Sequence, residues 1–223
     1  MRIGTWNLAG LWDHRRRALI ESLNVDVWLF TEISEHTELP GFHSVWAAGE
    51  MAAKRRWAAV FAREHLRALP QPHPATAAAD LAGLTLWSSI LPWRTCGEQP
   101  PWRGADHTQR TRATLDALIA ASPDRRLVWG GDWNHALEGR EYAGSHDGRA
   151  AILETVGRFG LAVPTAQLGH HLPGLLTIDH IAVPTEWRCT TRHVVAEVEE
   201  TRLSDHDIYI IDVQPDAEAL RKP

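Results

Sequence analysis

Apolar residues along the chain fall into short runs, and most of these runs end in polar residues or glycines. The clearest run is Leu127-Val128-Trp129, which is followed by Gly130-Gly131 and then by Asp132 and Asn134. This pattern predicts a buried strand that opens into a loop at its carboxyl end. Residues i and i+2 of an extended segment point to the same side, so we expect Asp132 and Asn134 to share one face.

The N-terminal part of the chain repeats this pattern on both sides of a predicted helix. Residues 2–7 alternate and stop at Asn7, and residues 25–32 are apolar enough for a central strand that ends in Glu32. Asp13 can cap a helix that reaches about Leu23. A strand, a helix and a strand at this spacing favour a layered α/β fold. Further strands are predicted at residues 42–47, 57–63, 66–69, 80–91, 175–183, 191–198 and 208–211, and helices at residues 106–121 and 149–159.

The composition is ordinary for a globular protein. The 223 residues predict one domain over residues 1–223, with 44% hydrophobic and 23% charged residues. A net charge of -5 gives no general basic field, so unspecific binding to polyanions is not predicted. No apolar run has the length of a membrane span, and the N-terminus lacks the apolar region of a signal peptide, so a cytoplasmic location is expected. Cys96 and Cys189 form neither a disulfide framework nor a metal-binding pattern.

Four more polar clusters lie at or near the ends of predicted strands. They are Asn7, Glu32, Asp179 with His180, and Asp205 with His206. Taken singly, an asparagine at a strand end is usually a turn residue, and a Ser-Asp-His turn is usually solvated. Asp179 differs from these, because a carboxylate inside an apolar strand costs several kcal/mol unless it has a partner.

The order and context of these five clusters resemble the endonuclease/exonuclease/phosphatase superfamily, and the resemblance runs from Arg2 to Ile211. It implies a four-layer α/β sandwich, in which two mixed β-sheets pack face to face with helices outside. It also implies metal-dependent chemistry on phosphoesters, with a phosphoester substrate that can be a nucleic acid. No protein partner is predicted.

The resemblance assigns three residues to a divalent metal, Mg²⁺ with Mn²⁺ as a second possibility. Glu32 matches the carboxylate that binds the metal, and a hard cation such as Mg²⁺ prefers oxygen ligands and keeps several waters. Asn7 would support the metal site and hydrogen-bond Glu32 or the phosphate of the substrate. Asp205 would act near the metal.

Four residues match the positions that act on the reacting groups. Asp132 matches the residue that orients or deprotonates the attacking water, and Asn134 would hold a phosphoryl oxygen or that water. His206 matches the histidine that donates to the phosphate as negative charge develops. Asp179 would hold the orientation and charge of His206. Positioning and charge neutralisation of this kind are the main requirements of phosphoryl transfer.

Two positions depart from the pattern of the superfamily. Many members have a histidine or tyrosine at the end of the long middle strand, where this chain has Ser88 and Ser89. Some nucleases have an acid two residues after the first asparagine, where this chain has Ala9. These departures affect the predicted substrate, leaving-group protonation and a second metal more than the fold.

Three functions agree with these observations. The first is a Mg²⁺-dependent, nuclease-like phosphodiesterase, and the second is a phosphatase or phosphodiesterase of small or lipid-linked phosphates. The third is a member of the superfamily that binds phosphorylated ligands and has lost catalysis. A zinc site built on His135, His170, His171 and His180 matches no known spacing, so these are interpreted as loop histidines.

Overall fold

Two β-sheets make up most of the computed structural model, which describes residues 1–214. The seven-stranded sheet has the order β12 (Arg188–Val194), β15 (Ile208–Gln214), β1 (Arg2–Asn7), β2 (Val27–Ser34), β5 (Arg55–Ala62) and β3 (His43–Trp46), and β4 (Glu50–Ala52) also pairs with β5. The six-stranded sheet has the order β10 (Leu161–Ala162), β11 (Asp179–Pro184), β9 (Leu127–Asp132), β8 (Leu84–Ser89), β7 (Thr76–Leu81) and β6 (Arg67–Ala68). A separate hairpin consists of β13 (Glu197–Val198) and β14 (Thr201–Arg202).

Both sheets are mixed. The pairs β1–β2 and β8–β9 are parallel, whereas β15 runs antiparallel to β1, and β11 runs antiparallel to β9. The carboxyl ends of β1, β2 and β9 and the amino ends of β11 and β15 therefore carry the polar residues at corresponding edges of the two sheets.

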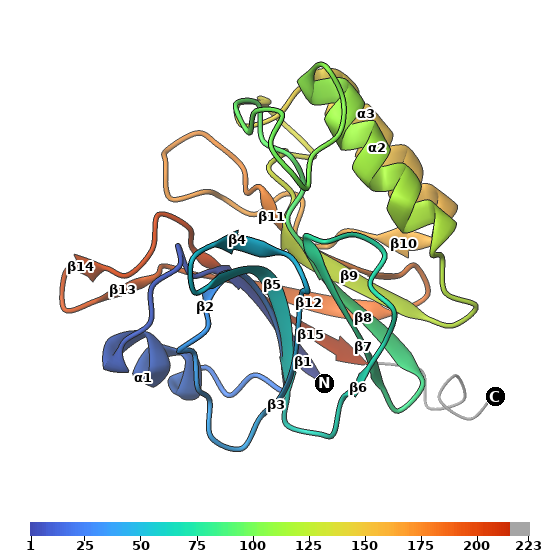
Figure 1. Cartoon of the computed structure of the whole chain (residues 1–223). Coiled ribbons are helices and arrows are strands. Elements are labelled where there is room, and N and C mark those ends of the chain that lie inside the picture. Colours follow the sequence, from blue (N-terminus) through green and yellow to red (C-terminus); the bar gives the residue numbers. More distant parts are fainter. Residues whose placement is uncertain (215–223) are drawn as a thin grey trace.

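Three apolar layers hold the fold together. The largest lies between the two sheets and includes Leu29, Val60, Leu86 and Ile181. A second cluster packs α1 (His14–Ser22) on the outer face of the seven-stranded sheet, and a third packs α2 (His107–Ala120) and α3 (His146–Arg158) on the six-stranded sheet. Figure 1 shows α1 and the α2–α3 pair on opposite sides of the stacked sheets. The predicted four-layer sandwich is confirmed.

Each helix begins at a polar N-cap. The side chains of Asp13, Asp106 and Ser145 accept hydrogen bonds from Arg16, Gln109 and Gly148 backbone N–H groups, respectively. Such bonds satisfy backbone donors that have no partner within the helix. The prediction of α3 from residue 149 was wrong by three residues, because Ser145 starts the helix at His146.

The predicted strand at residues 80–91 is right only from Leu84 to Ser89, because the chain reverses near the start of the predicted range. Ala82 and Gly83, with φ of 49° and 92°, form a two-residue turn between β7 and β8. Positive φ at both central positions is typical of tight hairpin turns. The Oδ1 atom of Asp80 accepts a hydrogen bond from Gly83 N, which supports the turn.

Two other predicted strands are also divided. Only residues from Asp179 onward form β11, and the preceding part of the predicted strand at 175–183 belongs to a hairpin closed by the Gly169–Leu176 bridge. The predicted strand at 191–198 is β12, which begins earlier at Arg188, followed by the short β13.

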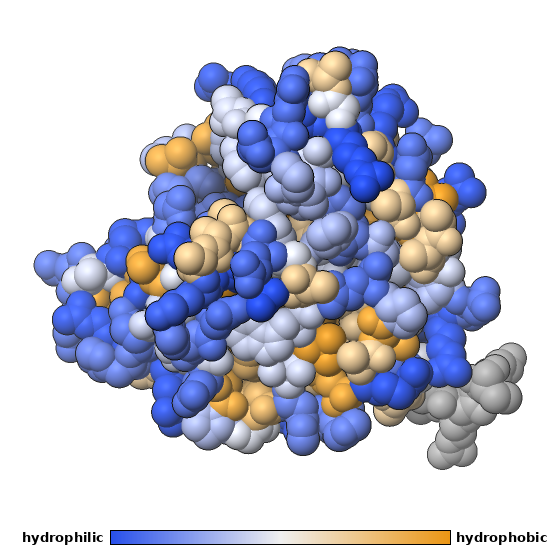
Figure 2. Space-filling model, viewed as in Figure 1, coloured by the Kyte–Doolittle hydropathy of each residue, from blue (hydrophilic) through white to orange (hydrophobic). Residues whose placement is uncertain are grey.

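The surface seen in Figure 2 is mainly hydrophilic, and its hydrophobic residues form small patches separated by polar ones. Among the helices within residues 1–214, none has the length and apolar character needed to cross a membrane.

Candidate active site

The sheet topology brings polar residues from distant parts of the chain together. Asn7 ends β1, Glu32 lies in the last part of β2, and Asp132 ends β9. Asp179 begins β11 directly opposite Asp132 in the register, and His206 lies just before β15. These five residues form one connected group at the edge where the two sheets meet.

Asn7 links the two sheets. Its Nδ2 atom donates to Glu32 Oε1 and to Asp132 Oδ2, both at 3.0 Å. Its Oδ1 atom accepts from Ala9 N at 2.9 Å, which fixes the orientation of the amide. Since Asn7 is almost completely buried, these bonds hold the two carboxylates at a defined separation.

Glu32 reaches the site because β2 is irregular at this position. Trp28, Phe30 and Ile33 pack in the cluster under α1, so the alternation of the strand breaks between residues 30 and 33. Glu32 has φ of 45° and no partner in the register with β5, although its neighbours Thr31 and Ile33 are paired. An irregularity of this kind redirects one side chain, and here it turns Glu32 toward Asn7.

The carboxyl end of β9 is shaped by a close approach of two backbones. Gly131 has φ of 121°, and a Cβ atom at this position would lie 2.2 Å from Ser89 O. Beyond it, Asn134 N donates to Asp132 Oδ1, and Asn134 Nδ2 donates to Leu91 O, both at 3.0 Å. These bonds fix the Asp132 carboxylate. They do not involve the Asn134 Oδ1 atom, which can therefore accept a hydrogen bond from a ligand.

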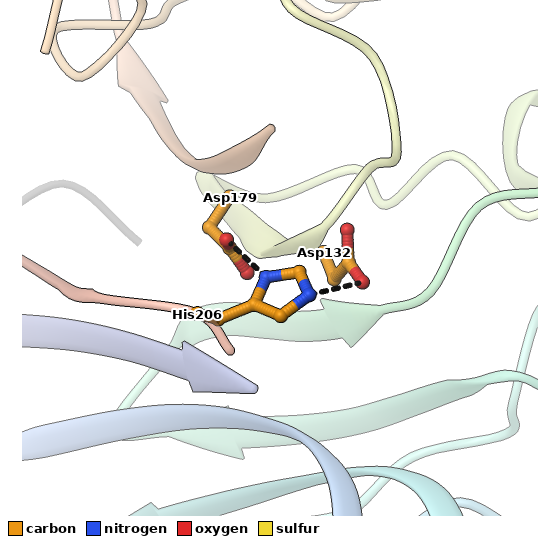
Figure 3. A group of neighbouring side chains, drawn as sticks. All are labelled: Asp132, Asp179 and His206. Atoms are coloured by element: carbon orange, nitrogen blue, oxygen red, sulfur yellow. Dashed lines mark hydrogen bonds and ion pairs between the residues drawn. The ribbon is translucent and has the colours of Figure 1, made fainter. Parts of the chain in front are cut away.

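His206 lies between two buried carboxylates (Figure 3). Its Nδ1 atom is 2.7 Å from Asp179 Oδ2, and its Nε2 atom is 3.9 Å from Asp132 Oδ2. The first contact is a hydrogen bond, whereas the second is an ion-pair distance that exceeds hydrogen-bond length.

The backbone around His206 is tied to the N-terminal half of the chain. Trp6 Nε1 donates to His206 O, and Ser204 Oγ donates to Asn7 O at 2.7 Å. Arg16 was not singled out in the sequence, but its buried guanidinium donates to Leu203 O. The His206 loop is therefore held by both β1 and α1.

The close carboxylates and the imidazole shift one another's protonation. Burial raises the pKa of Asp132 to about 7, in part against the charge of His206 and assisted by repulsion from Asp179 and Glu32. Burial opposes protonation of His206, but the charges of Asp179 and Asp132 outweigh it and raise its pKa to about 10. Burial also raises the pKa of Asp179. The His206–Asp179 pair therefore carries at least one proton at neutral pH.

The donor atoms fit a hard divalent cation. Asp132 and Asp179 flank the imidazole of His206, Glu32 is joined to Asp132 through the Asn7 amide, and the buried Asp179 Oδ1 atom has no hydrogen-bond partner among residues 1–214. Asp132, Asp179 and His206 place one ligand atom each within 4.8 Å of one another. The His206 Nδ1 atom is already bonded to Asp179, so the oxygen atoms suit a metal better than the imidazole does.

The remaining predicted residues lie outside this bonded group. Asp205 is exposed, and its carboxylate contacts Ser204 Oγ at 3.4 Å, although its charge acts on His206. Ser88 and Ser89, where a histidine or tyrosine was expected, are buried and bonded to Phe30 O and to the Trp129 indole. These serines therefore belong to the core.

The four histidines considered for zinc do not form a metal group within residues 1–214. Their interpretation as loop histidines was wrong for His180, which lies on β11, and His135 is also completely buried. His180 Nε2 bonds to His135 O at 2.9 Å, so this pair has a packing role. His170 and His171 lie on the Gly169–Leu176 hairpin, near His206.

Solved structures with the same architecture include two endonucleases and a 3′ phosphatase. The 3′ phosphatase NExo from Neisseria, bound to a product DNA hairpin, has a TM-score of 0.69, 18% identity, and coverage of 96% of this chain and 99% of that chain. The endonuclease domain of TRAS1, a telomere-specific non-LTR retrotransposon, has a TM-score of 0.65, 14% identity, and coverage of 96% and 99%. The AP endonuclease LMAP from Leishmania major has a TM-score of 0.63, 15% identity, and coverage of 94% and 86%.

Among curated protein sequences, none matches the chain. The model of the Endonuclease/Exonuclease/phosphatase family matches residues 4–206, which include every member of the bonded group. The family consists of hydrolases that act on phosphoester bonds. The chain therefore belongs to the endonuclease/exonuclease/phosphatase family and is a phosphoester hydrolase.

Proposed function

We propose that the protein is a nuclease-like phosphodiesterase that depends on a divalent metal. The observation that carries this proposal is the continuous polar group that runs from Glu32 through Asn7 and Asp132 to His206 and Asp179. This group contains the Asp132 carboxylate, the protonated His206 ring and Glu32, which is the candidate metal ligand. The similarity to a 3′ phosphatase bound to a DNA hairpin and to a retrotransposon endonuclease supports a nucleic-acid substrate.

In this proposal Asp132 acts on the attacking water. Its raised pKa of about 7 lets it accept a proton near neutral pH, and Asn7 and the Asn134 backbone hold its two oxygens in place. The water oxygen forms a bond to phosphorus while one of its protons passes to Asp132. The bond from phosphorus to the leaving oxygen then breaks, and solvent protonates that oxygen.

His206 stabilises the charge that develops on the phosphoryl oxygens. Asp179 keeps the ring oriented and protonated, so Nε2–H can donate as negative charge increases. Asn134 Oδ1 would hold the attacking water. The Asn7 amide is already bonded to Glu32, Asp132 and Ala9 N, so Asn7 would position the two carboxylates rather than contact the phosphate.

A Mg²⁺ or Mn²⁺ ion, held by Glu32 with Asn7 and Asp205 near it, would supply positive charge to the phosphate when bound. The excess of carboxyl groups over cationic side chains in the bonded group favours such an ion.

The decisive assay compares a chromogenic phosphodiester with the corresponding monoester, in EDTA and then with Mg²⁺, Mn²⁺ or Zn²⁺. We expect hydrolysis of the diester with Mg²⁺ or Mn²⁺, and a loss of at least about 100-fold in Asp132→Ala, the effect typical of an acid–base group. Activity that survives both EDTA and the substitution would refute the proposed function.

A phosphatase or phosphodiesterase of small or lipid-linked phosphates is the second candidate. The net charge of -5 favours it, since proteins that bind long polyanions usually present a basic surface. Turnover of the monoester in the same assay would support this function. Binding of phosphate compounds without turnover would identify a member of the family that has lost catalysis.

A further inference from the structure

A hairpin next to His206 carries two histidines that have no part in the site described so far. It spans residues 168–177, with backbone bonds from His170 N to Leu175 O and from Thr177 N to Leu168 O, both at 2.9 Å. In Figure 1 it extends from the start of β11 beyond the end of the sheet. Two residues after the hairpin, Asp179 begins the strand that holds His206.

Two tyrosine hydroxyls hold this hairpin, one on each of its strands. Tyr209 of β15 donates to Gly169 O at 2.9 Å, and Tyr142 of the loop after β9 donates to Leu176 O at 3.0 Å. The ring of Tyr142 also meets His170 edge to face, with 5.5 Å between centroids. The hairpin is therefore fixed relative to the two elements that frame the site.

The histidine rings lie within electrostatic reach of His206. Burial, and then the charges of His171 and His206, lower the pKa of His170 to about 4. Burial, Arg202 and His206 act in the same direction on His171, whose pKa is also lowered. The two rings are adjacent, with centroids 4.1 Å apart, and both are only partly exposed.

Hydrogen bonding defines which atom His170 presents to a ligand. Its Nδ1 atom accepts from Leu172 N at 3.1 Å, so the proton of the neutral ring lies on Nε2. His170 therefore presents an Nε2–H donor. Nearby, the buried atoms His171 Nδ1 and Arg202 Nη2 have no hydrogen-bond partner among residues 1–214.

From this geometry we propose that His170 and His171, beside Arg202, bind a second phosphate of the substrate that adjoins the phosphate at His206. Neutral imidazole donors and a guanidinium are suitable ligands for phosphate oxygens. The inference rests on the proposed function and narrows its substrate class to chains with at least two neighbouring phosphates, such as an oligonucleotide. A simple diester with a single phosphate does not use this site.

The test compares two substrates and two double variants. His170→Asn keeps an acceptor for Leu172 N and removes the outward donor, and it is combined with His171→Ala. The control is His43→Asn with His65→Ala, which changes another pair of neighbouring histidines, 5.4 Å apart, on exposed positions. The substrates are bis(p-nitrophenyl) phosphate and a thymidine pentanucleotide, and KM and kcat are measured with Mg²⁺.

We expect KM for the pentanucleotide to rise about ten-fold in the His170/His171 variant, the effect of losing one hydrogen bond to a charged group. Kinetics of the single-phosphate diester should remain within about two-fold, and the control variant should match the unsubstituted enzyme. Replacing the adjoining phosphate by a neutral methylphosphonate should raise KM in the unsubstituted enzyme but add nothing in the His170/His171 variant.

An unchanged KM for the pentanucleotide would overturn the second phosphate site. Equal losses on both substrates would also overturn it, because they would indicate a structural effect on His206. If the unsubstituted enzyme hydrolyses neither substrate, the proposed function fails instead. Fluorescence anisotropy of a labelled pentanucleotide then still tests the site, since binding must be about ten-fold weaker in the variant.

Discussion

Replacing Asp179 with asparagine tests the central pair of the site. The substitution keeps the size of the side chain but removes the charge that lies 2.7 Å from His206 Nδ1. The pKa of His206 is raised from 6.5 to about 10 against the effect of its burial. This difference corresponds to about 5 kcal/mol in favour of the protonated ring, and Asp179 contributes to it through both its charge and its hydrogen bond.

The expected result follows from the direction of that shift. In the proposed mechanism His206 donates from Nε2 only while the ring is protonated, so the donor should persist up to a pH of about 10. Without the Asp179 charge, burial lowers the pKa of the ring, and the alkaline limb of kcat/KM should move down by at least about two pH units. A shift of two units alone reduces kcat/KM about two-fold at pH 8 and about 50-fold at pH 10, where the protonated fraction falls from about one half to about 0.01.

The assay is the pH dependence of kcat/KM on the chromogenic diester, measured for the enzyme, Asp179→Asn and Asp212→Asn. Asp212 is a suitable control because it is an exposed residue of β15 that pairs with Arg2. Its substitution should leave the profile unchanged. An unshifted alkaline limb in Asp179→Asn, with normal folding, would refute the assigned function of the pair.

Two predictions concern stability. Burial lowers the pKa of both His135 and His180 to about 4, so between pH 6.5 and pH 4 the unfolded chain binds protons that these rings in the folded protein do not. Each ring should therefore take about 2 kcal/mol from the free energy of unfolding between pH 7 and pH 5. Urea unfolding of the protein and of His180→Gln checks this, because groups such as Asp132 titrate in both; the same pH dependence in the two proteins would contradict it. Gly131→Ala should lower the free energy of unfolding by more than about 2 kcal/mol, because its Cβ would lie 2.2 Å from Ser89 O at a positive φ. Gly157→Ala is the control, because Gly157 is on the exposed side of α3 with open space around the new Cβ. Its free energy of unfolding, measured by thermal unfolding, should rise by up to about 1 kcal/mol. Equal effects of the two substitutions would contradict the prediction.

Local patterns predicted most of the architecture. Apolar runs with polar ends located β1, β2, β9 and β15, and the resemblance of their end residues to one family gave the layer order. The strand at residues 80–91 was right only in part because Ala82 is not a typical turn residue, and its positive φ depends on the pairing of β7 with β8. Turn chemistry at Gly83 was the signal that could have divided it.

Other features depend on contacts between distant segments. The pattern of apolar and polar residues in β2 does not predict the irregularity that turns Glu32 toward Asn7. The arginine run at residues 15–17 is typical of a solvated face, yet Arg16 is buried and bonded to Leu203 O across the molecule. Histidines such as His180 look like loop or metal residues in the sequence, and only their neighbours show that they are packed in the core.

The most direct measurement is the Mg²⁺ dependence of phosphodiester hydrolysis for the enzyme and for Glu32→Gln. EDTA should abolish hydrolysis, Mg²⁺ or Mn²⁺ should restore it, and Glu32→Gln should require at least about ten-fold more Mg²⁺ for half-maximal activity. Hydrolysis that persists in EDTA, or an unchanged Mg²⁺ requirement in Glu32→Gln, would contradict a metal-assisted site built around Glu32, Asp132 and His206.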